Sequence, residues 1–201
     1  MKKLAIISTN KAQYSETFIR NQIQHLPFEV LVLSNGYLPK EYSTDRGSSF
    51  QEIPLKKSDP KVNLKKFLKK QSVDAVLVQY GPSAVEALPV IQKLKLPTIV
   101  HFHGYDAYRD DILNSYGKSY AGVFDEAAAV IAVSDDMKRQ LIHLGCPVDK
   151  LHQIKYGVDI NSFVPAEVKR EQQFISCGRF VEKKSPLTTI EAFSKVLKDH
   201  Q

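Results

Sequence analysis

The chain has 201 residues, 43% of them hydrophobic and 25% charged, and its formal net charge is +6. These values are those of a folded globular protein and exclude a peptide, a linker or a disordered segment. The apolar run Leu4–Ile7 is too short for a signal-peptide core or a membrane span, so we expect a cytoplasmic protein.

Short apolar runs alternate along the chain with stretches of helical periodicity. The runs are nearly continuous in apolar character, as strands of a parallel sheet are when helices cover both faces. The sequence therefore predicts an α/β fold with a doubly wound, Rossmann-like parallel sheet. The predicted strands cover residues 4–8, 29–34, 74–81, 98–104, 129–134 and 151–157, and the predicted helices cover 15–26, 84–94 and 135–145.

A lysine-rich segment lies between the second and third predicted strands. In residues 63–71 the apolar positions Leu64, Phe67 and Leu68 follow helical spacing, so the lysines should occupy the opposite face of a short amphipathic helix. That face is either simply solvated or in peripheral contact with an anionic membrane. No nucleic-acid-binding motif accompanies the charge, so nucleic acid is not an expected partner. The lysines are Lys56, Lys57, Lys61, Lys65, Lys66, Lys69 and Lys70.

The segment HFHGYD, residues 101–106, follows the strand predicted at 98–104 and contains two histidines and an aspartate. Ligands of a doubly wound sheet bind beyond the carboxyl ends of its strands, where the loops after Ser8, Tyr80 and Ser134 should also gather. Gly104 permits a sharp turn that brings His103 to this edge, where it could donate to a sugar hydroxyl or to a developing charge. An ordinary packed imidazole remains the alternative for both histidines, and for His101 in particular.

The apolar periodicity stops at residue 159 and restarts at residue 174, which indicates an interdomain linker. A strand at 174–180 and a helix at 185–200 should follow, with Ser185 as the N-cap and Pro186 as the first helical residue. One strand and one helix cannot bury a core of their own. We therefore expect one domain at 1–165 and, at 166–201, the linker and the first βα unit of a second domain.

The segment CGRFVEKKSP, residues 177–186, places Arg179 and Lys184 just before this second helix. Guanidinium and ammonium groups bind phosphate oxygens, and no acid stands in the first turn of the helix to occupy its positive end. A pyrophosphate site is one interpretation, and solvated basic residues near a turn are the other. By contrast Asp135 and Asp136 follow Ser134, so for that loop we favour helix capping.

Several site classes lack their defining motif. The sequence contains no GxGxxG, GxxxxGK[ST], GxSxG, HExxH or Asp-x-Asp, and its two cysteines do not have metal-ligand spacing. No metal and no cofactor are therefore expected, and phosphate charge should be neutralised by cationic side chains and amide groups.

Five segments, SETFI, HFHGYD, IAVSDDMKRQL, IKYGVD and CGRFVEKKSP, occur in this order. With them the chain resembles the retaining family-4 glycosyltransferases of bacterial polysaccharide and lipopolysaccharide assembly. The resemblance implies a GT-B fold of two Rossmann-like domains, an acceptor domain followed by a nucleotide-sugar domain. It implies His103 as the catalytic residue, Arg179 and Lys184 as the donor diphosphate-binding pair, and, as acceptor or cleft candidates, Ser15, Tyr80, Gly104, Asp106 and Ser134.

The resemblance also implies an activity and its partners. A hexose would pass from a UDP- or GDP-sugar to a glycan or lipid-linked acceptor, at the inner face of the membrane. Two features depart from the family: Ser185 stands where a glycine is usual, and the acidic motif of the donor domain does not occur before Gln201. We therefore expect an incomplete enzyme that is inactive as this fragment. The alternatives are an acceptor-binding module whose donor domain is a separate polypeptide, and a GT-B nucleotide-sugar epimerase.

Overall fold

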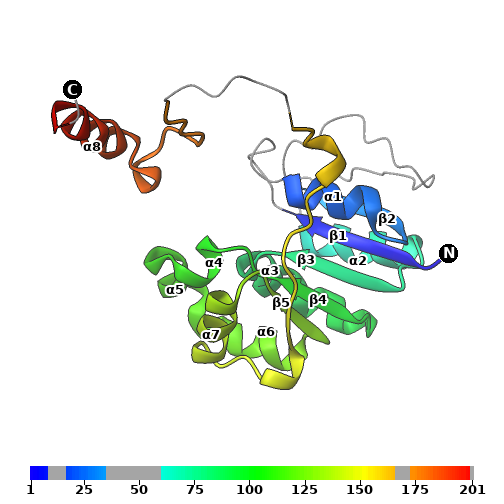
Figure 1. Ribbon diagram of the computed structural model, residues 1–201. Helices are drawn as coiled ribbons and strands as arrows, with labels where there is room; N and C mark the ends of the chain where they lie inside the picture. The colour runs from blue at the N-terminus through cyan, green and yellow to red at the C-terminus, as the bar shows by residue number, and fades with distance from the viewer. Residues whose placement is uncertain (9–16, 35–59, 166–172, 200–201) are drawn as a thin grey trace. The chain divides into compact units, whose positions relative to one another are not determined.

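The structure is a computed structural model that describes residues 1–8, 17–34, 60–165 and 173–199 (Figure 1). It divides into two compact units, Met1–Val158 and Asp159–Gln201. The cleft candidate Ser15 and the lysines Lys56 and Lys57 lie outside the described residues. Among the described residues, no helix is both long and apolar enough to cross a bilayer.

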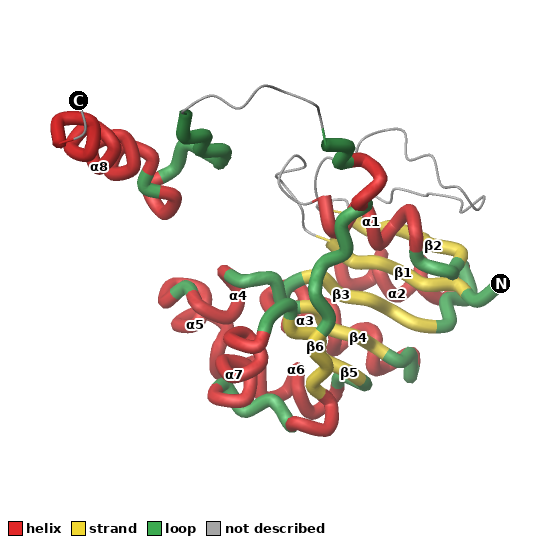
Figure 2. The backbone as a smooth tube through the Cα atoms, in the orientation of Figure 1, coloured by secondary structure: helices red, strands yellow, loops and turns green. Residues whose placement is uncertain are grey.

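The first unit is built on a parallel sheet of six strands in the order β2-β1-β3-β4-β5-β6, whose strands lie side by side in Figure 2. The predicted α/β, doubly wound Rossmann-like fold is confirmed. The sixth strand is shorter than predicted, because only its first three residues pair with β5. The strands are β1 Lys3–Ser8, β2 Glu29–Ser34, β3 Ala75–Gln79, β4 Thr98–His101, β5 Ala129–Ala132 and β6 Leu151–Gln153.

Helices cover both faces of this sheet and contribute to two separate apolar clusters. On one face Ile19 and Ile23 of α1 pack with Leu4, Ile6 and other strand residues. On the other face α2, α3, α6 and α7 contribute to the larger cluster. Each fully buried aliphatic side chain stabilises the fold by about 1.5–3 kcal/mol. The helices are α1 Thr17–His25, α2 Pro60–Lys70, α3 Gly81–Ile91, α4 Tyr105–Tyr108, α5 Asp110–Tyr116, α6 Tyr120–Glu126 and α7 Asp135–His143.

The amphipathic helix predicted in the lysine-rich segment is present as α2. Leu64, Phe67 and Leu68 are buried in the larger cluster. The lysines between them, Lys65, Lys66, Lys69 and Lys70, are exposed. Over residues 64–70, the apolar face of α2 is therefore used by the fold itself, and the charged face meets solvent.

The sheet order creates one topological switch point. The chain leaves β1 toward β2 on one side, and β3 then pairs with the opposite edge of β1. Because all strands are parallel, their carboxyl ends lie along one edge, with Gln79 of β3 directly beside His101 of β4. Binding sites of such sheets are found at this edge.

In the second unit the helix predicted at 185–200 is present as α8, Pro186–Asp199, preceded by the 3₁₀ turn η6, Glu182–Lys184. The strand predicted at 174–180 is wrong, since residues 173–180 form no strand. A strand needs a hydrogen-bonded neighbour, and the described part of this unit contains no other strand to pair with. Phe174 instead packs against Phe193 of α8, with ring centroids 5.2 Å apart.

The predicted N-cap of α8 is also different in the structure. Ser185 does precede Pro186, but its φ of 46° places it in the left-handed region instead of the extended conformation of an N-cap. Its hydroxyl donates to the carbonyl of Glu182, 3.2 Å away, so the oxygen is turned toward the preceding turn.

Candidate functional site

The carboxylate of Asp106 organises the backbone at the carboxyl edge of the sheet. It accepts hydrogen bonds from the backbone N–H groups of Gly81 at 3.1 Å, His103 at 3.0 Å and Gly104 at 2.8 Å. These bonds tie the start of α3 to the loop after β4. Burial raises the pKa of Asp106, and the backbone N–H donors oppose that rise by stabilising the carboxylate. Asp106 is 0% exposed, so the prediction that it lines an open cleft is corrected: its acceptors serve the backbone.

The turn from β3 into α3 is unusually tight. A Cβ on Gly81 would lie 2.6 Å from Phe102 and 2.7 Å from the Tyr120 ring, so only glycine fits there. The preceding residue, Tyr80, adopts a φ of 74°, a strained value for a non-glycine residue that often marks functional positions. Tyr80, an acceptor or cleft candidate, is buried, and its ring packs against His103.

His103 is half-buried and makes hydrogen bonds with both ring nitrogens. Its Nε2 lies 2.6 Å from Oε1 of Gln79, the last residue of β3. Its Nδ1 lies 2.6 Å from the hydroxyl of Tyr156, which follows β6. The histidine thus joins the carboxyl ends of strands that are not neighbours in the sheet.

The contacts continue from Gln79 into the interior. The Gln79 amide nitrogen donates to Oε1 of Gln22 in α1 at 2.7 Å, and Gln22 Nε2 lies 3.1 Å from Nδ1 of His101. His101 is 2% exposed, so the alternative of a buried imidazole applies to it. Within the described residues, His101 Nε2 has no hydrogen-bond partner. Tyr156, His103, Gln79, Gln22 and His101 form one connected cluster, which we call the glutamine–histidine chain.

Aromatic rings surround His103. The ring of Phe18 in α1 lies 4.6 Å from His103 and 4.4 Å from Tyr156, and Tyr80 lies 4.6 Å from His103 on an edge-to-face geometry. The two imidazoles are themselves 4.1 Å apart. Apolar surroundings of this kind disfavour a charged imidazole.

The pKa values follow from this environment. Burial lowers the pKa of His101 to about 4. Burial also lowers the pKa of His103 to about 2, with a smaller contribution from the neighbouring His101. Both imidazoles are therefore neutral at physiological pH, and His103 acts there through hydrogen bonds and not as a cation.

The remaining predicted site residues take other roles or belong to the second unit. Gly104 adopts a φ of 139°, which only glycine accommodates readily, and provides the turn after β4. Ser134 caps α7 by accepting from the backbone N–H of Met137 at 3.1 Å, the capping role favoured above. Arg179 and Lys184 belong to the second unit, where both are exposed.

Three members of the cluster were not selected from the sequence, namely Gln22, Gln79 and Tyr156, and neither was Phe18, whose ring packs against His103 and Tyr156. Phe18 and Tyr156 lie within the segments SETFI and IKYGVD, which carried the family resemblance. Gln79 had its own signal, since it is a polar residue that ends an apolar strand, AVLVQ, and it is fully buried. Gln22 follows Phe18 by one helical turn, so both side chains lie on the same face of α1.

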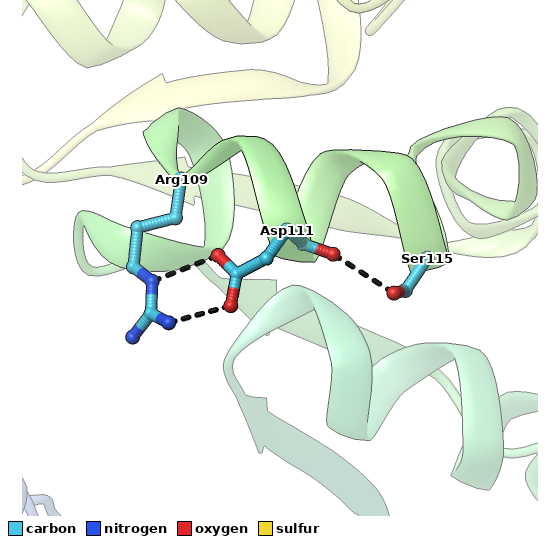
Figure 3. A network of polar contacts seen from close by, with 3 residues as sticks. All are labelled: Arg109, Asp111 and Ser115. Carbon is cyan, nitrogen blue, oxygen red and sulfur yellow. Dashed lines mark hydrogen bonds and ion pairs between the residues drawn. The ribbon is translucent and has the colours of Figure 1, made fainter.

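A second polar network lies on α5 and is exposed (Figure 3). Arg109 binds Asp111 with two hydrogen bonds, of 2.9 and 2.5 Å, and Ser115 donates to the Asp111 carbonyl at 2.8 Å. Its charged groups are solvent-exposed and contribute little to stability. No group of His, Cys, Asp or Glu among the described residues is arranged to hold a metal ion.

The geometry can now be compared with known proteins. The sequence model named Glycosyltransferase Family 4 matches residues 16–162. A protein of Escherichia coli strain K12, named as the colanic acid biosynthesis glycosyltransferase WcaL, is 32% identical over 126 residues, which are 59% of this chain and 30% of that protein. The matched part of this chain therefore covers less than a third of that relative's length.

Two solved structures share the fold at low sequence identity. The complex of Anabaena HepE with UDP-glucose aligns with a TM-score of 0.65 and 14% identity, over 83% of this chain and 47% of that one. UDP-N-acetylglucosamine 2-epimerase from Rickettsia bellii aligns with a TM-score of 0.53 and 13% identity, over 76% of this chain and 44% of that one. The family match covers most of the described sheet and its helices. The chain belongs to glycosyltransferase family 4.

Proposed function

We propose that this chain forms the acceptor-side part of a glycosyltransferase that moves a hexose from a nucleotide-sugar to a glycan or lipid-linked acceptor, with retention of the anomeric configuration. The observation that carries the proposal is the polar cluster around His103 at the carboxyl edge of the sheet, in a chain of glycosyltransferase family 4. Substrates of doubly wound folds bind at this edge.

The relatives support a polysaccharide as the product and a nucleotide-sugar as the donor. WcaL is named for the biosynthesis of colanic acid, a polysaccharide, which supports a role in polysaccharide assembly here. HepE was solved with UDP-glucose, which favours a UDP-sugar over a GDP-sugar as donor. A lipid-linked acceptor would fit an enzyme that works at the inner face of the membrane.

The residue roles follow from chemistry. His103 contacts the sugar through a ring nitrogen, and its apolar surroundings keep it neutral while it does so. Arg179 and Lys184 bind the donor diphosphate, because a guanidinium fork and an ammonium group suit phosphate oxygens. They precede α8, whose first turn contains no acid that would repel the diphosphate. In this proposal residues 1–165 form the acceptor domain and 166–201 the linker and the start of the donor domain.

Two other functions are compatible with the fold. An epimerase shares it, but the 32% identity to WcaL and the family match favour the transferase. An acceptor-binding module, with the donor domain on a separate polypeptide, would use the same edge of the sheet. The exposed lysines of α2 add a proposed peripheral contact with anionic lipid.

The test is a transfer assay with the polypeptide that contains this chain. UDP-sugars and GDP-sugars are offered with a lipid-linked glycan fraction, and the product's anomeric configuration is read by NMR. Transfer with retention supports the proposal, and transfer with inversion contradicts its mechanism. Epimerisation or hydrolysis of the donor without acceptor would favour the epimerase. Acceptor binding with no turnover until a second polypeptide is added would favour the module.

A further inference from the structure

In the glutamine–histidine chain, the donor and the acceptor of each hydrogen bond can be assigned from the chemistry of the side chains. Gln79 Oε1 is a carbonyl oxygen and can only accept, so the His103 nitrogen 2.6 Å from it, Nε2, must carry the proton. A neutral His103 then has a lone pair on Nδ1. The Tyr156 hydroxyl, 2.6 Å from Nδ1, must therefore be the donor in that contact.

The same reasoning applies to the interior half of the glutamine–histidine chain, from Gln79 to His101. The amide nitrogen of Gln79 donates to Gln22 Oε1, so the Gln22 amide nitrogen is the group that meets His101 Nδ1 and donates to it. Every bond from Tyr156 to His101 consequently points the same way. Reversing any one bond would require both amides to rotate and both histidines to exchange tautomers.

We propose that Gln79, held in place by Gln22, is a positioning residue that fixes His103 as its Nε2–H tautomer, so that His103 presents Nδ1 as a hydrogen-bond acceptor to a hydroxyl of the bound substrate. This proposal differs from the sequence-based expectation, in which His103 could donate to a sugar hydroxyl or to a developing charge. The proposal rests on the proposed function only for the identity of that substrate, since the tautomer is a property of the chain itself.

The groups that face His103 favour a neutral ring. His101, whose ring lies 4.1 Å away, is neutral, and like Phe18 and Tyr80 it offers no counter-charge to a protonated His103. The carboxylate of Asp106 bonds to the backbone N–H of His103, and its oxygens are occupied by backbone donors. No described contact therefore supplies an anion to the imidazole ring.

The Tyr156 hydroxyl marks the direction from which a substrate hydroxyl would approach Nδ1. Tyr156 is 38% exposed and follows the short strand β6, so its hydroxyl group is at the solvent side of the cluster. A donor hydroxyl on a sugar has the same hydrogen-bonding chemistry as the phenol, and can take its place on Nδ1.

The test is the tautomer of His103 in the purified chain, read from the two ring nitrogens by long-range ¹H–¹⁵N NMR. The chain contains six histidines, so the His103 signals are assigned by their loss in His103→Asn. We expect the wild-type spectrum to show a protonated Nε2 and an unprotonated Nδ1, with no titration of His103 near pH 6.5. A protonated Nδ1, or titration near pH 6.5, overturns the proposal.

The positioning role is tested with Gln79→Leu, which removes the acceptor for Nε2–H. The two ring shifts of His103 should then move toward each other, because the two tautomers interconvert without a fixed partner. Gln153→Leu is the matched control, since Gln153 also ends a parallel strand, and it should leave the His103 spectrum unchanged. Unchanged tautomer populations in Gln79→Leu would refute the role of Gln79. If this variant does not fold, Gln22→Leu is used, and the wild-type spectrum still decides the tautomer.

Neither measurement uses a donor or an acceptor. A failed transfer assay together with the Nε2–H tautomer would therefore refute the proposed function and leave this inference standing. Transfer activity together with the Nδ1–H tautomer would refute the inference alone.

Discussion

His103 makes its ring contacts at the solvent side of the apolar core, and it is the residue on which the proposed chemistry depends. In the active enzyme we expect His103→Ala to lower kcat about a hundredfold, since one hydrogen bond made in the transition state contributes roughly 3 kcal/mol. The melting temperature should fall moderately, because Gln79 and Tyr156 each lose a hydrogen-bond partner. Full kcat in the variant would exclude the catalytic role, and a collapse of the melting temperature would show that the ring is mainly structural.

The carboxylate of Asp106 should matter for stability and not for substrate contact. Asp106→Asn replaces one acceptor oxygen by an amide nitrogen that faces backbone N–H donors, and a buried unsatisfied donor costs about 1–3 kcal/mol. Asp106→Ala should cost more, because it leaves the three N–H groups of residues 81, 103 and 104 without their acceptor. Urea unfolding measures both. Ser134→Ala, which removes an ordinary helix cap, is the comparison, and an unaltered midpoint in Asp106→Asn would contradict the structural role.

The two buried histidines predict how stability depends on pH. Their folded pKa values, about 4 for His101 and about 2 for His103, lie below the ordinary value of 6.5. The unfolded chain therefore binds more protons below pH 6.5, and stability falls as the pH falls from 6.5 toward 4. The fall should approach about 1.4 kcal/mol per pH unit for each histidine. Urea titrations across this window should show a shallower slope for His103→Asn. The same slope in both proteins would mean that the ring is not held neutral.

At the scale of single elements, α2 tests the proposed membrane contact. Its described apolar side chains, Leu64, Phe67 and Leu68, are buried in the core, so we expect binding to a bilayer to come from charge, at about 1 kcal/mol per lysine near the surface. We expect the chain to bind phosphatidylserine vesicles at low salt, and the Lys→Gln variant of Lys65, Lys66, Lys69 and Lys70 to lose this binding. Vesicle sedimentation measures it. In the control variant four other exposed lysines are replaced, Lys93, Lys95, Lys118 and Lys155. Equal losses in both variants would point to general charge and not to α2.

The helices and strands also show where an apolar sequence pattern is sufficient to predict secondary structure and where it is not. Helical spacing predicted α1, α2, α3 and α7, but not α4, α5 and α6, which lie between β4 and β5. The apolar runs predicted β1 to β5 because burial on both faces leaves a continuous apolar signature. The pattern at 174–180 looked the same but produced no strand, since periodicity says nothing about whether a pairing partner exists. The sequence therefore predicted the strands that have a partner, but not whether residues 174–180 would find one.

For the candidate site, the sequence indicated the carboxyl edge of the sheet but selected few of the residues that form the cluster there. His103 could be selected because HxH followed by glycine is a local signal. Gln22 and Gln79 could not be selected in this way, because the feature that distinguishes them is the hydrogen bond between their side chains. They are 57 positions apart in the sequence and meet only in the tertiary structure. Asp106 was selected as a residue that could contact a ligand, whereas in the structure its carboxylate accepts hydrogen bonds from backbone amides. The hydrogen-bond partners of buried polar groups depend on tertiary packing, and the pattern of residues along the sequence does not identify them.

At the scale of the whole molecule, the proposal predicts little activity for this chain by itself. Binding a nucleotide-sugar tightly requires a pocket, and the described second unit offers one long helix, two short turns and exposed cations. We expect no glycosyl transfer and at best millimolar binding, a free energy of roughly −4 kcal/mol. Isothermal titration with UDP- and GDP-sugars tests this. Micromolar binding or turnover would show that residues 1–201 already form a working site.

The position of β1 inside the sheet has a consequence for how the protein is made. One edge of β1 pairs with β2 soon after both leave the ribosome, but its other edge must wait for β3, which ends at Gln79. At 5–20 residues per second, the intervening 70 or so residues take roughly 4 to 14 s to synthesise. During that time an apolar strand edge is open to other nascent chains, with only Lys2 and Lys3 beside it to discourage stacking. A ribosome-associated chaperone would therefore have its greatest effect on the yield of this protein before residue 79 has emerged.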